Sequence, residues 1–230
     1  MDGMPKEAVY AMVGIGGFML IFMVFMMRRS FRKAGEARSA AKAGIESLGL
    51  QLVRQAGART RSEGAYRGRP AWLETDGSAI MNMGNAAFGV GLAAEFISPA
   101  LSSHTRDEMN RKLGRMAKSG MDTAPMQLRF GVMLPGARGN AEIRKEAFPG
   151  ASAVGNGLHV RADGELAAVL ARPDVASALS ATQFDVITVD GAQACAIWIP
   201  PNKEYQRHMA QGGFTQIADR TLAALAALAS

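Results

Sequence analysis

The sequence has few of the residues that build covalent or metal-centred sites. It holds one cysteine, Cys195, and three separated histidines, His104, His159 and His208. A single cysteine excludes a disulfide scaffold and a thiolate zinc cluster. Aromatic residues are scarce at 7 %, but hydrophobic residues make up 48 % of the 230, which excludes a disordered chain. At roughly 150 residues per domain, the length predicts one domain, or one domain with an appendage.

Most of the chain also lacks an excess of either positive or negative charge. The net charge of +6 comes from residues 28–61, where nine basic residues stand against two acidic ones, whereas residues 62–230 are balanced. A general DNA-binding domain would carry its basic face on the folded body. The charge distribution therefore excludes that class.

One long apolar run is present. Residues 8–27, AVYAMVGIGGFMLIFMVFMM, are uncharged, and twenty helical residues measure about 30 Å, the thickness of a bilayer core. The segment before the run is acidic, and the run is longer than that of a cleaved signal peptide. The pattern predicts a single, uncleaved transmembrane helix.

The residues around this run predict its orientation and contacts. Basic residues next to a span stay in the cytoplasm, and they also attract anionic lipid headgroups. We therefore expect an N-terminus outside a bacterial cytoplasmic membrane and a cytoplasmic C-terminal part. Membrane anchoring is assigned to Arg28, Arg29, Arg32 and Lys33.

Small residues in the run predict a close contact. Gly14, Gly16 and Gly17 leave a notch that would allow another helix, or a lipid or pigment ring, to approach the backbone closely. We assign helix packing to these glycines and expect integral membrane subunits as partners.

The sequence predicts four segments: a short outer N-terminus (1–7), the transmembrane helix (8–27), a basic helical stalk (28–61) and a cytoplasmic domain (62–230). The stalk is inferred from an apolar stripe at helical spacing, which would pack on the chain's own domain or on a partner. Its members are Ala37, Ala41, Ile45, Leu48 and Leu52.

From Tyr66 onward the pattern changes to strands. Asp-Gly dipeptides at 76–77 and 190–191 predict two hairpins, over 69–83 and 184–199. The strand over 192–199 is apolar on both faces, so we expect it to be central. Further strands are predicted over 127–134 and 158–162, with a turn at 155–157.

Helices are predicted between and after these strands, over 103–118, 165–171, 174–180 and the C-terminal end, with Asp163 and Pro173 opening the second and third. The apolar segment 86–101 is compatible with a core helix, with a piece resting on a membrane or partner, or with a second span. Strands and helices do not alternate regularly, so the expected fold class is α+β with an antiparallel or mixed sheet.

No motif for catalysis or for cofactor binding occurs in the sequence: it has no phosphate loop, no CxxC and no HExxH. Cys195 is expected to be inert in its strand, because burial raises a thiol pKa. His104, His159 and His208 are interpreted as ordinary structural or surface histidines. The stretch Arg67–Arg69 resembles a small anion-binding patch. No catalytic residue, cofactor or metal is predicted.

These observations favour a non-catalytic accessory or scaffold subunit of a larger membrane complex, of respiratory, photosynthetic, transport or secretory type. Two alternatives stay open. One is a membrane-tethered sensing domain that binds a small ligand or soluble partner, and the other is a membrane-tethered enzyme whose groups converge from distant positions.

Overall fold

The computed structural model describes residues 39, 42–82, 111–112, 115–116, 118–120, 122–136, 139–210 and 213–229. The chain divides into two compact units, residues 1–42 and 43–230, and the sheet with its helices belongs to the second.

The described residues form one sheet of nine strands, and every neighbouring pair is antiparallel. The order across the sheet is β1-β2-β3-β4-β9-β8-β5-β7-β6. The strands are β1 (Leu50–Ala56), β2 (Arg59–Tyr66), β3 (Arg69–Asp76), β4 (Gln127–Met133), β5 (Asn140–Arg144), β6 (Ser152–Gly155), β7 (Leu158–Ala162), β8 (Val186–Asp190) and β9 (Gln193–Trp198).

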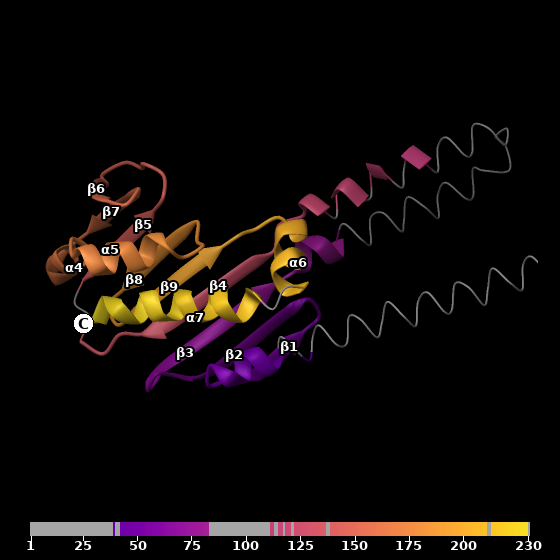
Figure 1. Cartoon of the computed structure of the whole chain (residues 1–230), viewed down its shortest axis with the longest axis horizontal. Helices are drawn as coiled ribbons and strands as arrows, with labels where there is room; N and C mark the ends of the chain where they lie inside the picture. Colours follow the sequence, from indigo (N-terminus) through magenta and orange to yellow (C-terminus); the bar gives the residue numbers. More distant parts are fainter. Residues whose placement is uncertain are drawn as a thin grey trace, which may run out of the picture. The chain divides into compact units, whose positions relative to one another are not determined.

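A layer of helices covers one face of this sheet (Figure 1). It comprises α4 (Gly164–Leu170), α5 (Pro173–Ser180), α7 (Gly213–Ala226) and the short 3-10 helix η2 (Ala227–Ala229), while α6 (Asn202–Ala210) packs beside α7. Alternate side chains of the strands point into this layer and are buried. The largest fully buried ones include Leu73, Leu128, Phe130, Ile143, Leu158 and Ile187.

The helix α7 supplies the central part of this layer. Phe214, Ala218, Leu222 and Leu225 recur every three or four residues and are buried, as expected for one face of a helix. The helix packs on β4 and β9. Burial of each large apolar side chain contributes about 1.5–3 kcal/mol, so α7 is a main stabiliser of the sheet's centre.

Several predicted elements are confirmed. The hairpin over 184–199 is β8–β9, its turn residue Gly191 has φ +56°, and β9 is the fifth of nine strands. The predicted strands over 127–134 and 158–162 are β4 and β7, and the predicted helices over 165–171 and 174–180 are α4 and α5. The C-terminal helix is α7.

The predicted hairpin over 69–83 is wrong in its second half. Residues 69–76 form β3, but residues 78–82 are helical. The Asp76 carboxylate accepts hydrogen bonds from the backbone N–H and the hydroxyl of Ser78, which is the chemistry of a helix N-terminus. The hairpin partner of β3 is β2, and the turn between them, Arg67-Gly68, has positive φ at both residues, as a type I′ turn requires.

The predicted helical stalk is also wrong where it is described. Residues 42–47 are helical, but Gly49 takes φ +80° and residues 50–56 form β1. Positive φ ends a helix, and β1 then pairs with β2 from Leu50↔Gly64 to Ala56↔Arg59. Leu52, expected on the helical stripe, lies on an edge strand and is 46 % exposed.

The expected fold class, a transmembrane helix and helical stalk before the domain, is therefore corrected to an antiparallel nine-stranded sheet with a few helices. Among the described residues, no helix is both apolar and long enough to cross a bilayer. The helix α7, with 14 residues, measures only about 21 Å. Residues 8–27, the segment 86–101 and most of 103–118 lie outside the described residues.

Candidate functional site

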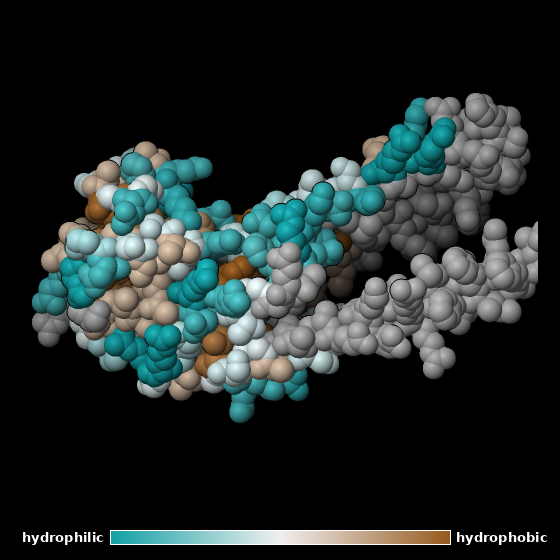
Figure 2. All heavy atoms as spheres, viewed as in Figure 1, coloured by the Kyte–Doolittle hydropathy of each residue, from teal (hydrophilic) through white to brown (hydrophobic). Residues whose placement is uncertain are grey.

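The side of the sheet opposite the helix layer presents the other half of the strand side chains, and we call it the open face. Arg129, Met133, Thr188, Asp190 and Gln193 are exposed there, between the buried positions of the same strands. The open face is defined by these five side chains and by Arg54, Arg59, Arg61, Glu63, Trp72, Glu74, Asp76, Gln127, Glu142, Arg161, Val186, Cys195 and Ile197. The helix side, seen in Figure 2, mixes hydrophilic and weakly hydrophobic residues with small separate hydrophobic spots.

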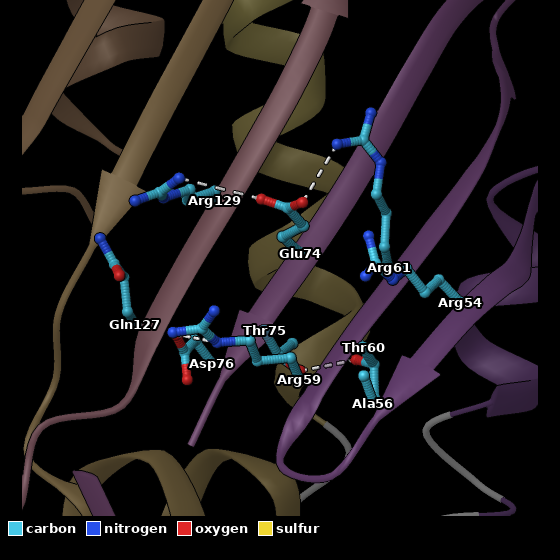
Figure 3. A pocket seen from close by; sticks show the side chains of 10 residues that line it. All are labelled: Arg54, Ala56, Arg59, Thr60, Arg61, Glu74, Thr75, Asp76, Gln127 and Arg129. Carbon is cyan, nitrogen blue, oxygen red and sulfur yellow. Dashed lines mark hydrogen bonds and ion pairs between the residues drawn. The ribbon is translucent and has the colours of Figure 1, made fainter. Parts of the chain in front are cut away.

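A pocket of about 380 Å³ lies over β1–β4, and its charged side chains belong to the open face (Figure 3). We call it the arginine pocket. Strand register builds it, because Arg54 is opposite Arg61, Arg61 is opposite Glu74, and Glu74 is opposite Arg129. Its lining residues are Arg54, Ala56, Arg59, Thr60, Arg61, Glu74, Thr75, Asp76, Gln127 and Arg129.

Two carboxylates partly neutralise this pocket. Glu74 lies 3.0 Å from an Arg61 nitrogen and 4.0 Å from an Arg129 nitrogen, and Asp76 lies 2.8 Å from Nε of Arg59. Four guanidinium groups against two carboxylates leave a net charge of +2 on the lining. Guanidinium groups bind carboxylates and phosphates in bidentate geometry, so the arginine pocket is built to take an anionic group.

The pKa of Asp76, one of the lining residues, follows from its burial and its polar neighbours. Burial acts to raise the pKa of this carboxyl, but the hydrogen bonds from Ser78 and the nearby Arg59 charge outweigh burial, and the pKa lies below its usual value. Asp76 is therefore ionised at neutral pH and holds Arg59 in place.

Arg54 differs from the other arginines of the pocket. It lies on β1 and is exposed, and no residue in the described part of the chain forms an ion pair with it. A guanidinium group with no internal partner is available to an external anion.

An aromatic surface adjoins the pocket. The indole of Trp72 lies over Gly131, so closely that a Cβ atom there would come within 2.1 Å of the Trp72 Cε2 atom. The Arg61 guanidinium carbon is 5.1 Å from the centre of the Trp72 ring, within the range of a cation–π contact. Arg61 and Trp72 therefore contact each other on the open face.

A second pocket, of about 470 Å³, lies over β8, β5 and β7 and carries the opposite charge. We call it the acidic pocket. Glu142 is 2.6 Å from Arg144 and 2.6 Å from Arg161, and Asp163 accepts the backbone N–H of Asn140. Its lining residues are Asn140, Ala141, Glu142, Arg161, Ala162, Asp163, Thr188, Val189 and Asp190, with a net charge of −2.

Asp190 is the counterpart of Arg54 in this pocket. It is exposed at the end of β8, and no ion-pair partner for it occurs among the residues that the structure describes. The two pockets thus each contain one exposed charged group that is free to meet an external partner.

The Arg67–Arg69 stretch, which resembles an anion-binding patch, lies at the β2–β3 turn beside α7. Arg69 donates a hydrogen bond of 2.8 Å to the carbonyl oxygen of Ala226, so it ties the turn to the C-terminal end of that helix. Arg67 lies 3.8 Å from Asp219 and its side chain is 66 % exposed, and anion binding there stays a prediction.

Cys195 and the histidines behave as structural residues. Cys195 is half-buried on β9, and this burial raises the pKa of its thiol to about 11, as expected for an unreactive cysteine. His159 lies on β7, and His208 packs edge-on against Trp198 at 5.7 Å and lies 3.8 Å from Glu204. The described residues contain no group of three side chains suited to a metal ion, and His104 lies outside them.

The residues assigned to membrane anchoring (Arg28, Arg29, Arg32 and Lys33) and to helix packing (Gly14, Gly16 and Gly17) all lie outside the described residues, so both assignments stay predictions. Arg54, Arg59 and Arg61 were expected to extend the basic stalk, but they belong to the sheet. The sequence shows these arginines clearly, but their grouping with Arg129 depends on strand register, which no local pattern reveals.

A comparison of the chain with family models, curated proteins and solved structures finds no match. The expected membership of a membrane complex through a single-pass helix therefore has no support from relatives, and the described residues hold no membrane-spanning helix.

Proposed function

We propose that the unit 43–230 is a non-catalytic accessory or scaffold module that binds a protein partner through the open face. The observation that carries this proposal is the combination, on one uncovered sheet face, of the arginine pocket with the adjoining Trp72. Tryptophan and arginine are the residues most enriched where protein interfaces gain their binding energy.

The placement of these side chains on strands supports binding. Strands hold side chains more rigidly than loops do, and a preorganised surface loses less conformational entropy on association. Arg61 contacts both Glu74 and Trp72 in the absence of a partner, which favours one placement of its side chain. Exposed apolar side chains around them, such as Met133 and Ile199, offer area that a partner can bury.

The alternative of a ligand-sensing domain is favoured by one observation. The arginine pocket, at about 380 Å³, falls within the roughly 300–1,000 Å³ of small-molecule sites. Its lining is mainly charged, whereas small-molecule sites are mostly apolar. We therefore prefer an anionic side chain of a protein as the group that enters the pocket.

Site-specific photo-crosslinking in the full chain, in its own cells, tests the proposal. A photo-reactive residue at Gln193, exposed on the open face, is compared with one at Ser177, exposed on α5 in the helix layer. We expect protein adducts from position 193 that are absent from position 177. Equal adducts from both positions, or none from either, would overturn the docking role.

A ligand screen tests the alternative of a ligand-sensing domain. A small ligand at 100 times its dissociation constant would stabilise the folded chain by about 2.7 kcal/mol. We expect that no anionic metabolite raises the unfolding temperature of the full chain by binding at Arg54. A metabolite that raises this temperature in the unchanged chain but not in the Arg54→Ala variant would favour the sensing domain.

A further inference from the structure

We propose that the open face binds a short segment of another protein that carries an acidic side chain and an apolar side chain about 14 Å apart. The acidic group enters the arginine pocket, and the apolar group enters a separate pocket beside Trp72. This inference rests on the proposed docking role of the open face and names the chemistry of the partner.

The second pocket, of about 410 Å³, lies over β2, β3 and the end of β4, and we call it the Trp72 pocket. Pro70 and Trp72 are two residues apart on β3 and therefore share one face of the sheet. Met133 on β4 completes the apolar part of the lining and is 37 % exposed. An indole, a proline ring and a flexible thioether suit an aliphatic or aromatic side chain. The lining residues are Arg61, Glu63, Gly64, Pro70, Ala71, Trp72 and Met133.

The two pockets lie in line along β3. Asp76 and Glu74 line the arginine pocket. The next two positions on the same face, Trp72 and Pro70, line the Trp72 pocket. The midpoints of these two pairs are four residues apart, which is about 14 Å at about 3.4 Å per residue. A bound segment would cover this distance with about four residues if it is extended, or with about nine if it is helical.

The charge of each pocket indicates what it takes. The arginine pocket carries +2 on its lining, and Arg54 is exposed there without an ion-pair partner in the described part of the chain. It therefore attracts carboxylates. In the Trp72 pocket, Arg61 and Glu63 form an ion pair of 2.5 Å, so its lining is neutral. Two adjoining pockets of different chemistry suit a segment in which the charged group orients binding and the apolar group adds affinity.

Selection from a displayed library of random peptides tests the proposal. The bait is the tagged full chain, kept in non-ionic detergent because residues 8–27 are apolar. We expect enriched peptides to carry an acidic residue and a large apolar residue at one of the two spacings. Selection on Arg54→Ala should weaken the preference for the acidic residue, and selection on Met133→Ala should weaken the preference for the apolar one.

Arg220→Ala and Met81→Ala are the matched controls. Both residues are exposed, and neither belongs to the lining of the arginine pocket or of the Trp72 pocket. Selection on these variants should enrich the same peptides as selection on the unchanged chain. Loss of the pattern on the controls as well would overturn the two pockets as its source.

The affinity of one enriched peptide, labelled with a fluorophore and measured by anisotropy, tests each contact. Replacing the acidic residue of the peptide by serine should weaken binding to the unchanged chain about tenfold, which corresponds to about 1.4 kcal/mol. The same replacement should cost much less on Arg54→Ala, because part of the contact is already lost. Replacing the apolar residue should depend on Met133 in the same way. Equal losses on the unchanged and variant chains would overturn the inference.

Failure of this inference is distinguishable from failure of the docking role. If position 193 gives protein adducts but the enriched peptides lack the acidic and apolar pair, or no peptide is enriched, the docking role stands and the inference is overturned. If position 193 gives no specific adducts, both are overturned.

Discussion

The contact between Trp72 and Gly131 sets the shape of the open face at the level of single residues. Gly131→Ala would place a methyl group 2.1 Å from the indole Cε2 atom, so the ring must move. Overpacking of this kind costs about 1–3 kcal/mol. We expect that loss in the free energy of unfolding, measured in urea.

The control for this prediction is the Trp72→Ala background. Without the indole, Gly131→Ala should cost nothing or should stabilise the strand slightly, since alanine loses less backbone freedom than glycine on folding. An equal cost in both backgrounds would show that the methyl group meets some other neighbour.

Tyr66 ties the β2–β3 hairpin to α7 and should report on pH. Burial, followed by its hydrogen bond of 2.5 Å to the Asp219 carboxylate, raises the pKa of Tyr66 to about 12. The folded pKa lies above the unfolded value of about 10, so the stabilisation is complete below pH 10 and is lost as the pH rises to about 12. Tyrosinate absorbance in an alkaline titration, with Tyr66→Phe for assignment, measures this step; ionisation near pH 10 would contradict it.

The residue-level expectations from sequence had mixed outcomes for clear physical reasons. The raised pKa of the Cys195 thiol was predictable, because burial in an apolar strand disfavours the thiolate and outweighs the nearby charge of Arg129. Asp163 precedes α4 as predicted, but its carboxylate binds the N–H of Asn140 and makes no side-chain cap bond. That hydrogen bond joins residues 23 positions apart, and no local pattern contains such a contact.

At the scale of elements, the segment 42–56 shows how one glycine redirects the chain. Ile45, Leu48 and Leu52 fit a helical stripe, yet the helix stops before Gly49. A Cβ atom at Gly49 would lie 2.4 Å from the Ala65 carbonyl oxygen. Any side chain there would also have to adopt φ +80°, which costs free energy for residues other than glycine. Sheet pairing with β2, which periodicity does not encode, turns the rest of the stripe into a strand.

Gly49→Ala should therefore destabilise the fold by more than the roughly 1–2 kcal/mol of a positive φ alone. Gly68→Ala is the comparison, because Gly68 has the same φ of +80° with open space around it. Urea unfolding of both variants separates the two costs. Equal losses would mean that the Ala65 carbonyl moves aside without cost.

The two predicted hairpins illustrate the limit of turn signals. Both contain Asp-Gly, but only Asp190-Gly191 joins two strands. After Asp76 the carboxylate binds Ser78 and starts a helical turn, and the amide N–H of Met81 then bonds to the Gly77 carbonyl. Asp76 binds Ser78 and favours a helical start there, while β3 pairs with β2 instead, a choice of partner that the Asp-Gly dipeptide does not reveal.

At the scale of the whole molecule, the proposed docking on the open face should be sensitive to salt. Raising the ionic strength from about 0.1 to about 1 M shortens the Debye length from about 10 to about 3 Å. The arginine pocket would then attract an anionic side chain of the partner only weakly, so crosslinking from position 193, repeated in a cell lysate, should yield less adduct at high salt. If the yield rises with salt, the basis of association is apolar and the arginine pocket does not guide it.

The position of β9 has a consequence for how the protein is made. Of the described strands it is the last in sequence but the fifth in the sheet, and among them it alone joins the group β1–β4 to the group β8-β5-β7-β6. During synthesis, the inner edges of β4 and β8 must wait unpaired until residues 193–198 leave the ribosome, and α7, which covers this seam, arrives later still. Unpaired strand edges invite aggregation. The partly made chain is therefore vulnerable until residues 193–226 have emerged, and chaperones that bind exposed strands would engage it in that interval.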